Sequence, residues 1–386
     1  MFSSVGLTAL CGLVISLPGA LAGFDPGATN NIAIYWGQNS INRANGQQRL
    51  ATYCSNTAVN VIPVAFLTSI KNPTLVNFAN AGDNCTTFPG TQLLSCPQIE
   101  EDIKTCQSLG KSILLSLGGA TYTEGGFASA AEATTWANTI WEMFGPPQPS
   151  STALRPFGSA SVDGFDMDFE AVSRNMAPFA AALRQRMDAV AGRKFFLSAA
   201  PQCPFPDAAM GEMLSQVAFD FVSVQFYNNY CGANSYVPGT GGNFNFARWD
   251  QWARTESVNR NVKVLLGVPG SPTAAGSGYV SGEQLRGVIQ YSRQFASFGG
   301  VMVWDMSQVY GNPGFLDSIV SALGGPAPPK TTTSTATTAT TLSTVTSKTA
   351  TTTSTAPTGS LVPHWGQCGG RGYTGPTQFK PTALIT

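Results

Sequence analysis

Short apolar runs recur between residues 31 and 307, separated by longer mixed segments. The runs are rich in β-branched and aromatic residues and almost continuously hydrophobic: residues 31–38, 59–67, 111–119, 162–170, 194–201, 219–228, 262–270 and 299–307. A strand that is buried on both faces needs this kind of sequence, because neither face meets water. The pattern therefore predicts eight strands of a largely parallel sheet.

Helical patterns fill the segments between the runs. One set of apolar residues repeats at helical spacing and would share one helix face: Met176, Phe179, Leu183, Met187 and Val190. Ser281 followed by Gln284 resembles the capping box that opens a helix. Eight strands alternating with helices predict a (β/α)8 TIM barrel, an α/β fold. A doubly wound open sheet is the alternative, disfavoured because no G-x-G-x-x-G follows the first strand.

Composition divides the chain into segments. Residues 1–22 are apolar and end in Ala20-Leu21-Ala22, which predicts a secretory signal peptide; a retained membrane anchor is the alternative. Residues 23–324 hold the strand and helix patterns. Residues 325–360 are rich in Ser and Thr and too polar to bury a core, which predicts a linker, either O-glycosylated or unmodified. Residues 361–386 form a short tail.

The charge balance and the residue types restrict the chemistry. The chain has 21 Lys and Arg residues against 21 Asp and Glu residues. No basic field attracts nucleic acid or an anionic membrane, so an uncharged or weakly charged substrate is expected. The only histidine, His364, lies in the tail, which excludes Ser-His-Asp and Cys-His catalysis in the barrel. We expect no metal and no cofactor, with carboxylates doing any acid–base work.

Eight cysteines are present, and two of them, Cys11 and Cys368, lie in the terminal segments. The other six form an even set in a chain expected to be secreted: Cys54, Cys85, Cys96, Cys106, Cys203 and Cys231. Such a set predicts three disulfides, with about fifteen pairings open. A zinc site is the alternative, but the chain has no C-x-x-C pair and no histidine near these cysteines.

The strand-like stretch "VDGFDMDFE", residues 162–170, carries four carboxylates. A strand sends alternate side chains to opposite faces, so Asp166, Asp168 and Glu170 would share one face and Asp163 would lie off it. Like charges at this spacing raise one another's pKa values, which is costly unless the arrangement has a use. The use is acid–base chemistry or, as the alternative, cation binding. Neighbouring strand ends add few oxygen ligands, which favours the chemistry.

Reactive groups of a (β/α)8 barrel gather at the carboxyl ends of its strands. The predicted strands end in amide, carboxyl and aromatic side chains and in glycines: Tyr35, Gln38, Gly118, Gly119, Glu170, Gln202, Gln225, Tyr227, Asn228, Trp304 and Asp305. Aromatic rings can stack on a sugar face while amide and carboxyl groups bind its hydroxyls. This set predicts a carbohydrate site.

The motif D-x-x-D-x-D-x-E at the fourth strand resembles the catalytic signature of family 18 glycoside hydrolases. Over about residues 31–320 the chain resembles the class III, hevamine-like chitinases. This resemblance rests on five further motifs that occur along the chain in the same order: "IYWGQN", "LSLGG", "AAPQCPFPD", "VQFYNN" and "GGVMVW". The resemblance implies a secreted endochitinase that cleaves β-1,4-linked N-acetylglucosamine polymers. It also implies retention of configuration, with the substrate's own acetamido group as the nucleophile.

The resemblance also implies roles for individual residues. Glu170 would be the general acid, Asp168 would orient the acetamido group and stabilise the oxazolinium ion, and Asp166 would share a proton with Asp168. Tyr227 would hold the acetamido oxygen, and Trp304 would form the floor of the site. The remaining expected substrate-binding residues are Tyr35, Gln38, Gly118, Gly119, Gln225 and Asn228. Asp163 is expected to be structural.

The resemblance further implies the disulfides Cys54–Cys106, Cys85–Cys96 and Cys203–Cys231. We expect a monomer whose partners are chitin and N-acetylglucosamine oligomers. The tail sequence "HWGQCGGRGYTGPT" resembles the start of a fungal cellulose-binding module, but the match stops after Thr377 and Phe379 stands where a second cysteine is expected. We therefore predict a truncated remnant. Three alternatives remain open: an endo-β-N-acetylglucosaminidase acting on N-glycans, a non-catalytic lectin or inhibitor, and a cell-wall structural glycoprotein.

Overall fold

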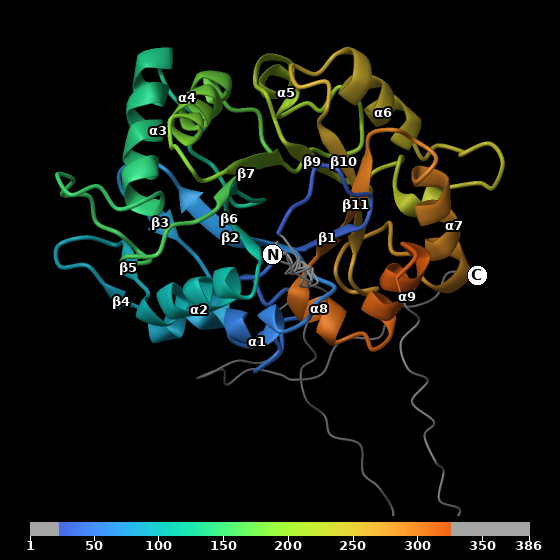
Figure 1. Cartoon of the computed structure of the whole chain (residues 1–386), viewed down its shortest axis with the longest axis horizontal. Helices are drawn as coiled ribbons and strands as arrows, with labels where there is room; N and C mark the ends of the chain where they lie inside the picture. The colour runs from blue at the N-terminus through green and yellow to red at the C-terminus, as the bar shows by residue number, and fades with distance from the viewer. Residues whose placement is uncertain (1–22, 326–386) are drawn as a thin grey trace, which may run out of the picture. The chain divides into compact units, whose positions relative to one another are not determined.

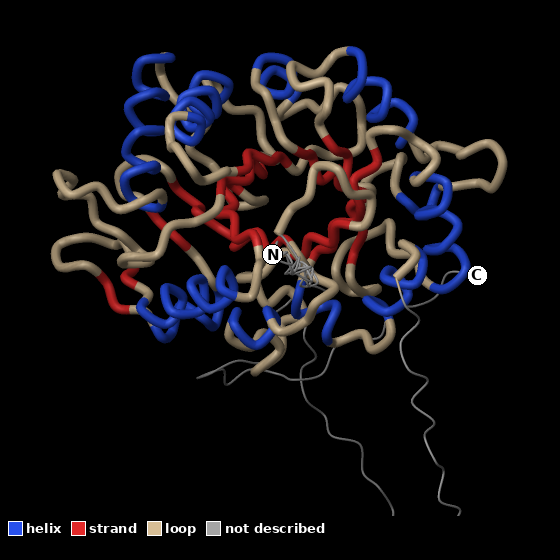
Figure 2. Tube along the Cα trace, viewed as in Figure 1, coloured by secondary structure: helices blue, strands red, loops and turns tan. Residues whose placement is uncertain are grey.

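Eight parallel strands form a closed ring in the computed structural model, which describes residues 23–325 (Figures 1 and 2). The ring consists of β1 (Asn31–Ile34), β2 (Val61–Ser69), β6 (Ser112–Gly118), β7 (Gly164–Asp168), β8 (Phe196–Ala199), β9 (Phe221–Gln225), β10 (Lys263–Pro269) and β11 (Phe298–Trp304). β1 pairs with both β11 and β2, which closes the barrel. The predicted (β/α)8 barrel is confirmed, and each strand falls on one of the eight apolar runs.

Helices surround the strands as an outer ring (Figure 2). They are α1 (Leu50–Cys54), α2 (Pro97–Ser108), α3 (Ala130–Phe144), α4 (Met176–Asp188), α5 (Gly211–Gln216), α6 (Phe246–Thr255), α7 (Gly282–Ser292), α8 (Met306–Tyr310) and α9 (Phe315–Ala322). The helix predicted from Met176 is α4. Ser281 is the N-cap residue of α7, but its side chain makes no capping hydrogen bond, so the capping-box prediction is correct only in its position.

An insertion between β2 and α2 was not predicted. It contains β3 (Leu75–Val76), the short 3-10 helix η1 (Ala79–Asn84) and the hairpin of β4 (Thr86–Thr87) and β5 (Leu94–Ser95). β3 pairs antiparallel with the end of β2, outside the barrel. These strands of two residues are too short to show any period in the sequence.

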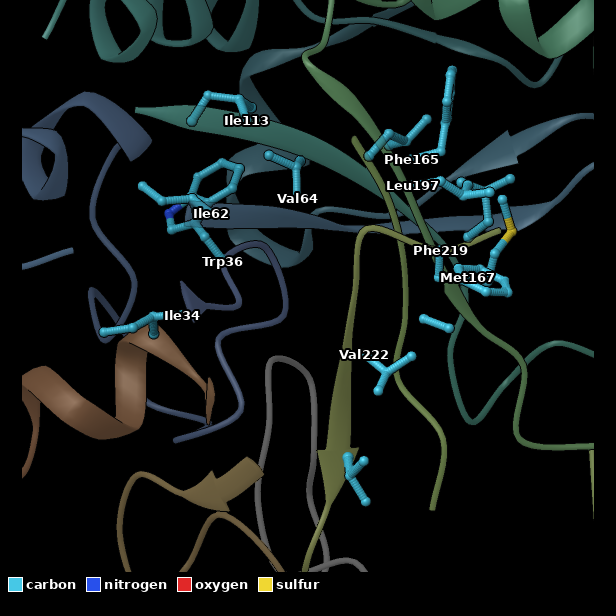
Figure 3. Packing of buried hydrophobic residues seen from close by; sticks show 14 of the residues in the cluster. Ile34, Trp36, Ile62, Val64, Ile113, Phe165, Met167, Leu197, Phe219 and Val222 are labelled. Atoms are coloured by element: carbon cyan, nitrogen blue, oxygen red, sulfur yellow. The ribbon is translucent and has the colours of Figure 1, made fainter. Parts of the chain in front are cut away.

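Two apolar layers follow from the alternation of side chains along the strands. One layer fills the barrel interior and includes Ala33, Leu114, Leu265 and Met302. The other layer lies between the strands and the helices; Figure 3 shows part of it, with Ile62, Val64, Phe165 and Met167 among its residues. Burial on both faces explains why the strand sequences are almost continuously hydrophobic.

Phe24 fills the end of the barrel at which the strands begin. Its ring lies 4.3 Å from that of Phe221 and 5.3 Å from that of Phe196, and these are the first residues of β9 and β8. Its backbone N–H donates to the hydroxyl of Ser112, the first residue of β6, at 3.0 Å. Phe24 is 4% exposed, so this end of the barrel is closed by an aromatic side chain from outside the eight strands.

We therefore expect Phe24→Ala to destabilise the fold by about 3–5 kcal/mol, because the deletion leaves a cavity at the base of the barrel. Thermal unfolding would show a lower melting temperature, with Phe24→Leu between the alanine variant and the wild type. A melting temperature unchanged in the alanine variant would show that Phe24 contributes no core packing.

Three disulfides connect the loops and helices around the barrel. They join Cys54 to Cys106, Cys85 to Cys96 and Cys203 to Cys231, with Cα–Cα distances of 5.2, 4.3 and 5.9 Å. The expected pairing is confirmed. The bridge from Cys203 to Cys231 joins the loop after β8 to the loop after β9, at the end of the barrel that carries the carboxylates. Within residues 23–325, no helix has the length and hydrophobicity of a membrane span.

Candidate active site

A cavity of about 230 Å³ lies at the carboxyl ends of the strands. Its walls come from loops and strand ends all round the barrel: Tyr35, Gln38, Phe66, Ala120, Thr121, Asp168, Glu170, Ala200, Gln225, Tyr227, Asn228, Ala274, Met302 and Trp304. A larger cavity of about 560 Å³ lies beside α3 and the β4–β5 hairpin, but no carboxylate lines it. Carboxylate acid–base chemistry can therefore take place only in the smaller of these two cavities.

The side chains of β7 lie on the two faces that the alternation along a strand predicts. Phe165, Met167 and Phe169 point into the layer between the strands and the helices. Asp166 and Asp168 hydrogen-bond to side chains of other barrel strands. Glu170 lies two residues beyond the end of β7 and lines the cavity.

Asp163 precedes β7, at the end of the strand away from the cavity. Its carboxylate pairs with the Arg193 guanidinium at 2.7 Å and accepts from the backbone N–H of Ile113 at 2.9 Å. The side-chain amide of Gln107 donates to it as well, at 2.9 Å. These contacts join α2, β6 and the segment before β8, and they support the prediction that Asp163 is structural.

Asp166 is buried in the barrel interior and accepts three hydroxyl hydrogen bonds. The donors are the phenol of Tyr35 at 2.7 Å, Ser116 at 2.7 Å and Ser198 at 2.6 Å. Burial raises the pKa of Asp166, and the three hydroxyl groups oppose the rise because they stabilise the carboxylate. The two serines were not predicted. They lie opposite Asp166 in the registers of β6 and β8, so only the strand register reveals them.

Asp168, at the end of β7, is 3% exposed and accepts from the Gln225 amide nitrogen at 3.0 Å. Its pKa lies well above the ordinary value, because the site buries it and because Glu170, Asp166 and Asp207 add negative charge nearby. The hydrogen bond from Gln225 opposes this rise. Asp168 therefore retains a proton to higher pH than a surface aspartate does. A proton shared between Asp166 and Asp168 stays a prediction, supported by the raised pKa values of both groups.

Glu170 is the accessible carboxyl group of the set. Partial burial raises its pKa; a hydrogen bond from the Gln225 amide lowers it and the negative charge of Asp207 raises it further. An acid that keeps its proton and can also reach a ligand has the two properties that a general acid needs.

Aromatic side chains form one wall of the cavity. The Trp304 ring stacks on Phe66 with centroids 5.8 Å apart and lies 5.5 Å from the Tyr35 ring. Burial and the charges of Asp168 and Glu170 hold the pKa of Tyr227 well above its ordinary value, so its phenol stays a hydrogen-bond donor. Phe66 was not singled out in the sequence, because an aromatic residue near the end of an apolar run is indistinguishable from a core residue.

The two predicted glycines have a backbone role and do not line the cavity. Gly118 has φ +109°, and a Cβ there would lie 2.5 Å from the carbonyl oxygen of Asp168. Gly119 donates its N–H to that same oxygen at 2.7 Å, and a Cβ there would lie 2.9 Å from the Phe66 ring. Both glycines thus let β6 approach Asp168 and Phe66 closely.

Gln38 and Asn228 line the cavity and also hold its loops. The amide nitrogen of Gln38 donates to the carbonyls of Ala65 at 2.8 Å and Asn77 at 3.0 Å, which leaves its amide oxygen as the acceptor of the side chain. The Asn228 side-chain oxygen accepts from the backbone N–H of Gly276 at 2.8 Å. This contact fixes the loop that carries Ala274 into the cavity.

The carboxylates of the site are poorly arranged for a cation. In residues 23–325, no group of three or more His, Cys, Asp or Glu side chains is placed to hold a metal ion. The oxygens of Asp166 accept from three hydroxyl groups, and a cation would have to displace these donors. The geometry favours acid–base chemistry.

Comparisons with known proteins find relatives of this chain. The model of the glycosyl hydrolases family 18 matches residues 31–294. Endochitinase 33 of Trichoderma harzianum is 53% identical over 320 residues, covering 82% of this chain and 99% of the relative. A class III chitinase of Arthroderma benhamiae is 48% identical over 330 residues, covering 84% of this chain and 94% of the relative.

Solved structures also share the barrel. The ICChI chitinase of Ipomoea carnea has a TM-score of 0.62 and 28% identity, covering 76% of this chain and 99% of that one. The xylanase and α-amylase inhibitor XAIP-II of Scadoxus multiflorus has a TM-score of 0.63 and 27% identity, covering 78% of this chain and 100% of that one. Because the family model matches more than half of its length, the chain belongs to family 18 of the glycosyl hydrolases.

Proposed function

We propose that this protein is an endochitinase that hydrolyses β-1,4-linked N-acetylglucosamine polymers with retention of anomeric configuration. The names of its relatives from Trichoderma harzianum and Arthroderma benhamiae support this substrate. The observation that carries the proposal is the placement of Glu170: an accessible carboxyl with a raised pKa, two residues beyond the buried Asp168, in a cavity with an aromatic wall.

In the proposed reaction, Glu170 donates its proton to the glycosidic oxygen as the bond from that oxygen to the anomeric carbon breaks. The carbonyl oxygen of the substrate's acetamido group forms a bond to the same carbon, which gives an oxazolinium ion and releases the first product. Glu170, now a carboxylate, accepts a proton from water as the water attacks the anomeric carbon, and the bond from that carbon to the acetamido oxygen breaks, which restores the acetamido group. Two inversions at that carbon give net retention.

The buried carboxyls would stabilise the intermediate. A positive charge beside Asp168 favours its ionised form, so the proton that the free site retains is released towards Asp166 as the oxazolinium ion develops. Tyr227 would donate its phenolic hydrogen to the acetamido oxygen, and Trp304 would lie against the apolar face of the sugar ring. Gln225 would keep Asp168 oriented, since its amide already donates to that carboxyl.

An open cleft supports cleavage within chains. Between β10 and β11 the chain has only α7 and loops, so no inserted domain covers the cavity there. The shared fold of the inhibitor XAIP-II shows that this barrel does not by itself imply hydrolysis. The enzyme proposal is favoured here because the general acid expected of the motif, Glu170, is present and accessible.

Chitotetraose should therefore be cleaved to products that are initially β-anomers, as followed by NMR within the first minutes. A thiazoline that mimics the oxazolinium ion should inhibit competitively, and EDTA should leave the rate unchanged. An initial α-anomer would rule out the acetamido mechanism, and strong inhibition by EDTA would favour the cation alternative. Release of N-glycans from a glycoprotein without cleavage of chitotetraose would identify the endo-β-N-acetylglucosaminidase instead.

We also infer that the protein is secreted. Support comes from the composition of residues 1–22 and from the three disulfides, which form and persist in oxidising compartments. The predicted signal peptide, most of the linker and the cellulose-binding remnant lie outside the described residues. The monomeric state stays a prediction, and so does the lack of a nucleic-acid or membrane partner.

A further inference from the structure

Asp207 is a buried carboxylate in the loop between β8 and α5, and the reaction described above does not use it. It is 6% exposed and accepts from three backbone N–H groups: Gln202 at 2.8 Å, Ala209 at 2.9 Å and Met210 at 2.6 Å. Among the ion pairs of residues 23–325, none includes Asp207. A buried charge without a cationic partner is costly, so its position calls for a physical reason.

The loop that Asp207 closes supports the catalytic carboxyls. Gln202, whose N–H Asp207 accepts, pairs with Gln225 across a parallel bridge to β9. The backbone N–H of Gln225 donates to the Pro201 carbonyl at 2.8 Å, and the N–H of Cys203 donates to the Gln225 carbonyl at 3.2 Å. The Gln225 side chain in turn donates to Asp168 at 3.0 Å. Asp207 is thus connected to Asp168 through the backbone of residues 201–203, which is hydrogen-bonded to Gln225, and through the Gln225 side chain.

The charge of Asp207 also acts on the site directly. It raises the pKa of Asp168 and that of Glu170, although for both groups burial is the larger cause. The other groups that face Glu170 are Asp168 on β7, which is also acidic, and two uncharged groups, Gln225 at the end of β9 and Tyr227 just beyond it. Burial raises the pKa of Asp207 itself, but its three partners are all donors and therefore favour its carboxylate form.

We propose that Asp207 is a positioning residue of the catalytic centre: through the backbone of Gln202, its carboxylate holds the β8–α5 loop against β9 beside Gln225, and its negative charge favours the protonated form of Glu170. This proposal rests on the proposed function, since it concerns the acid of that reaction. It extends the functional set beyond the barrel strands to the segment "AAPQCPFPD", in which Asp207 is the last residue.

The test is the pH profile of kcat on chitotetraose for Asp207→Asn. Hydrolysis needs protonated Glu170, so the rate falls as the pH rises through the pKa of that acid. Removing a neighbouring negative charge lowers this pKa, and the basic limb should move to lower pH. On the basic limb, kcat is proportional to the fraction of Glu170 that is protonated. When each protein's kcat is divided by its own plateau value, we expect the value for Asp207→Asn on this limb to be about threefold lower than that of the wild type. KM should change little.

Three further variants separate charge from structure. Asp207→Ser removes the charge but can still accept a backbone N–H, and it carries the test if the asparagine variant does not fold. Asp207→Glu keeps the charge and should keep the wild-type limb even if its activity is lower. Asp220→Asn is the matched control, because the Asp220 carboxylate also accepts a backbone N–H, from Leu197 at 2.9 Å, but precedes β9 at the other end of the barrel.

Asp220→Asn should lower the melting temperature and leave the limb in place. The proposal would be overturned if the basic limb stayed unchanged in both Asp207→Asn and Asp207→Ser. It would also be overturned if the limb moved as far in Asp207→Glu or in Asp220→Asn as in Asp207→Asn. Titration of Glu170 followed by ¹³C NMR of its carboxyl group gives the same comparison without turnover. If the wild type does not cleave chitotetraose, the proposed function fails, whereas an active wild type with an unmoved limb in Asp207→Asn contradicts only the role of Asp207.

Discussion

Glu170→Gln should lower kcat on chitotetraose by about 10²–10⁴-fold, the contribution typical of a positioned general acid. The amide keeps the size and the hydrogen-bonding shape of the side chain but cannot release a proton to the glycosidic oxygen. Binding should survive, because the aromatic wall formed by Trp304, Phe66 and Tyr35 does not depend on the charge of Glu170. Isothermal titration with the oligomer should therefore give a Kd close to that of the wild type.

Glu283→Gln is a suitable control for this substitution. Its carboxylate lies in the first turn of α7 with 89% of its side chain exposed, so its loss should change neither kcat nor stability measurably. Activity of Glu170→Gln within about threefold of the wild type would remove Glu170 from the role of general acid.

Asp168→Asn should be far more damaging to catalysis than Asp163→Asn, although both replace one carboxyl group of the same motif with an amide. The Asp168 carboxylate would stabilise a positive charge that exists only during the reaction. Losing such an interaction lowers kcat by about 10²–10³-fold with little change in KM. Because Asp168 is buried and carries a raised pKa, the neutral asparagine should be tolerated by the free protein.

Asp163→Asn should instead act on stability. It weakens the contacts with Arg193 and with the N–H of Ile113, which costs about 1–3 kcal/mol when a largely buried polar group loses a partner. Its kcat should stay near the wild-type value, since these contacts lie at the opposite end of β7 from the cavity. Measuring kcat and melting temperature for both variants decides the matter. Equal losses of kcat in two stably folded variants would contradict the division of roles along β7.

The local pattern of apolar and polar residues was enough to predict the barrel and the central residues of the site. The eight strands could be predicted because burial on both faces leaves a continuous apolar run in the sequence. The period of two placed Asp166 and Asp168 inside the barrel and Phe165 and Met167 outside it, as the structure confirms. The same period of two predicted that Glu170 lies on the side of Asp166 and Asp168, because it continues the inward face past the end of the strand.

Pairings between distant segments needed the tertiary structure. Residues alone left about fifteen disulfide pairings, and only the resemblance to a family narrowed them. The hydroxyl partners of Asp166 come from Ser116 and Ser198, which lie 50 and 32 residues away along the chain. Serines are common in strands, so no local signal separates these two from any others.

The functions of several loop and strand-end residues also could not be predicted from the sequence. The sequence does not single out Phe66, it predicts that Gly118 and Gly119 at the end of β6 contact the substrate, and it shows Asp207 only as part of a family motif. The functions of these residues depend on what the closed barrel brings beside them: Trp304 against Phe66, the Asp168 carbonyl against Gly118, and the Gln225 strand against the Asp207 loop. A sequence determines periodicity within each strand, because that is a property of neighbouring residues. Register, loop contacts and the electrostatics of buried charges depend on which strands lie side by side, and only the folded barrel decides this.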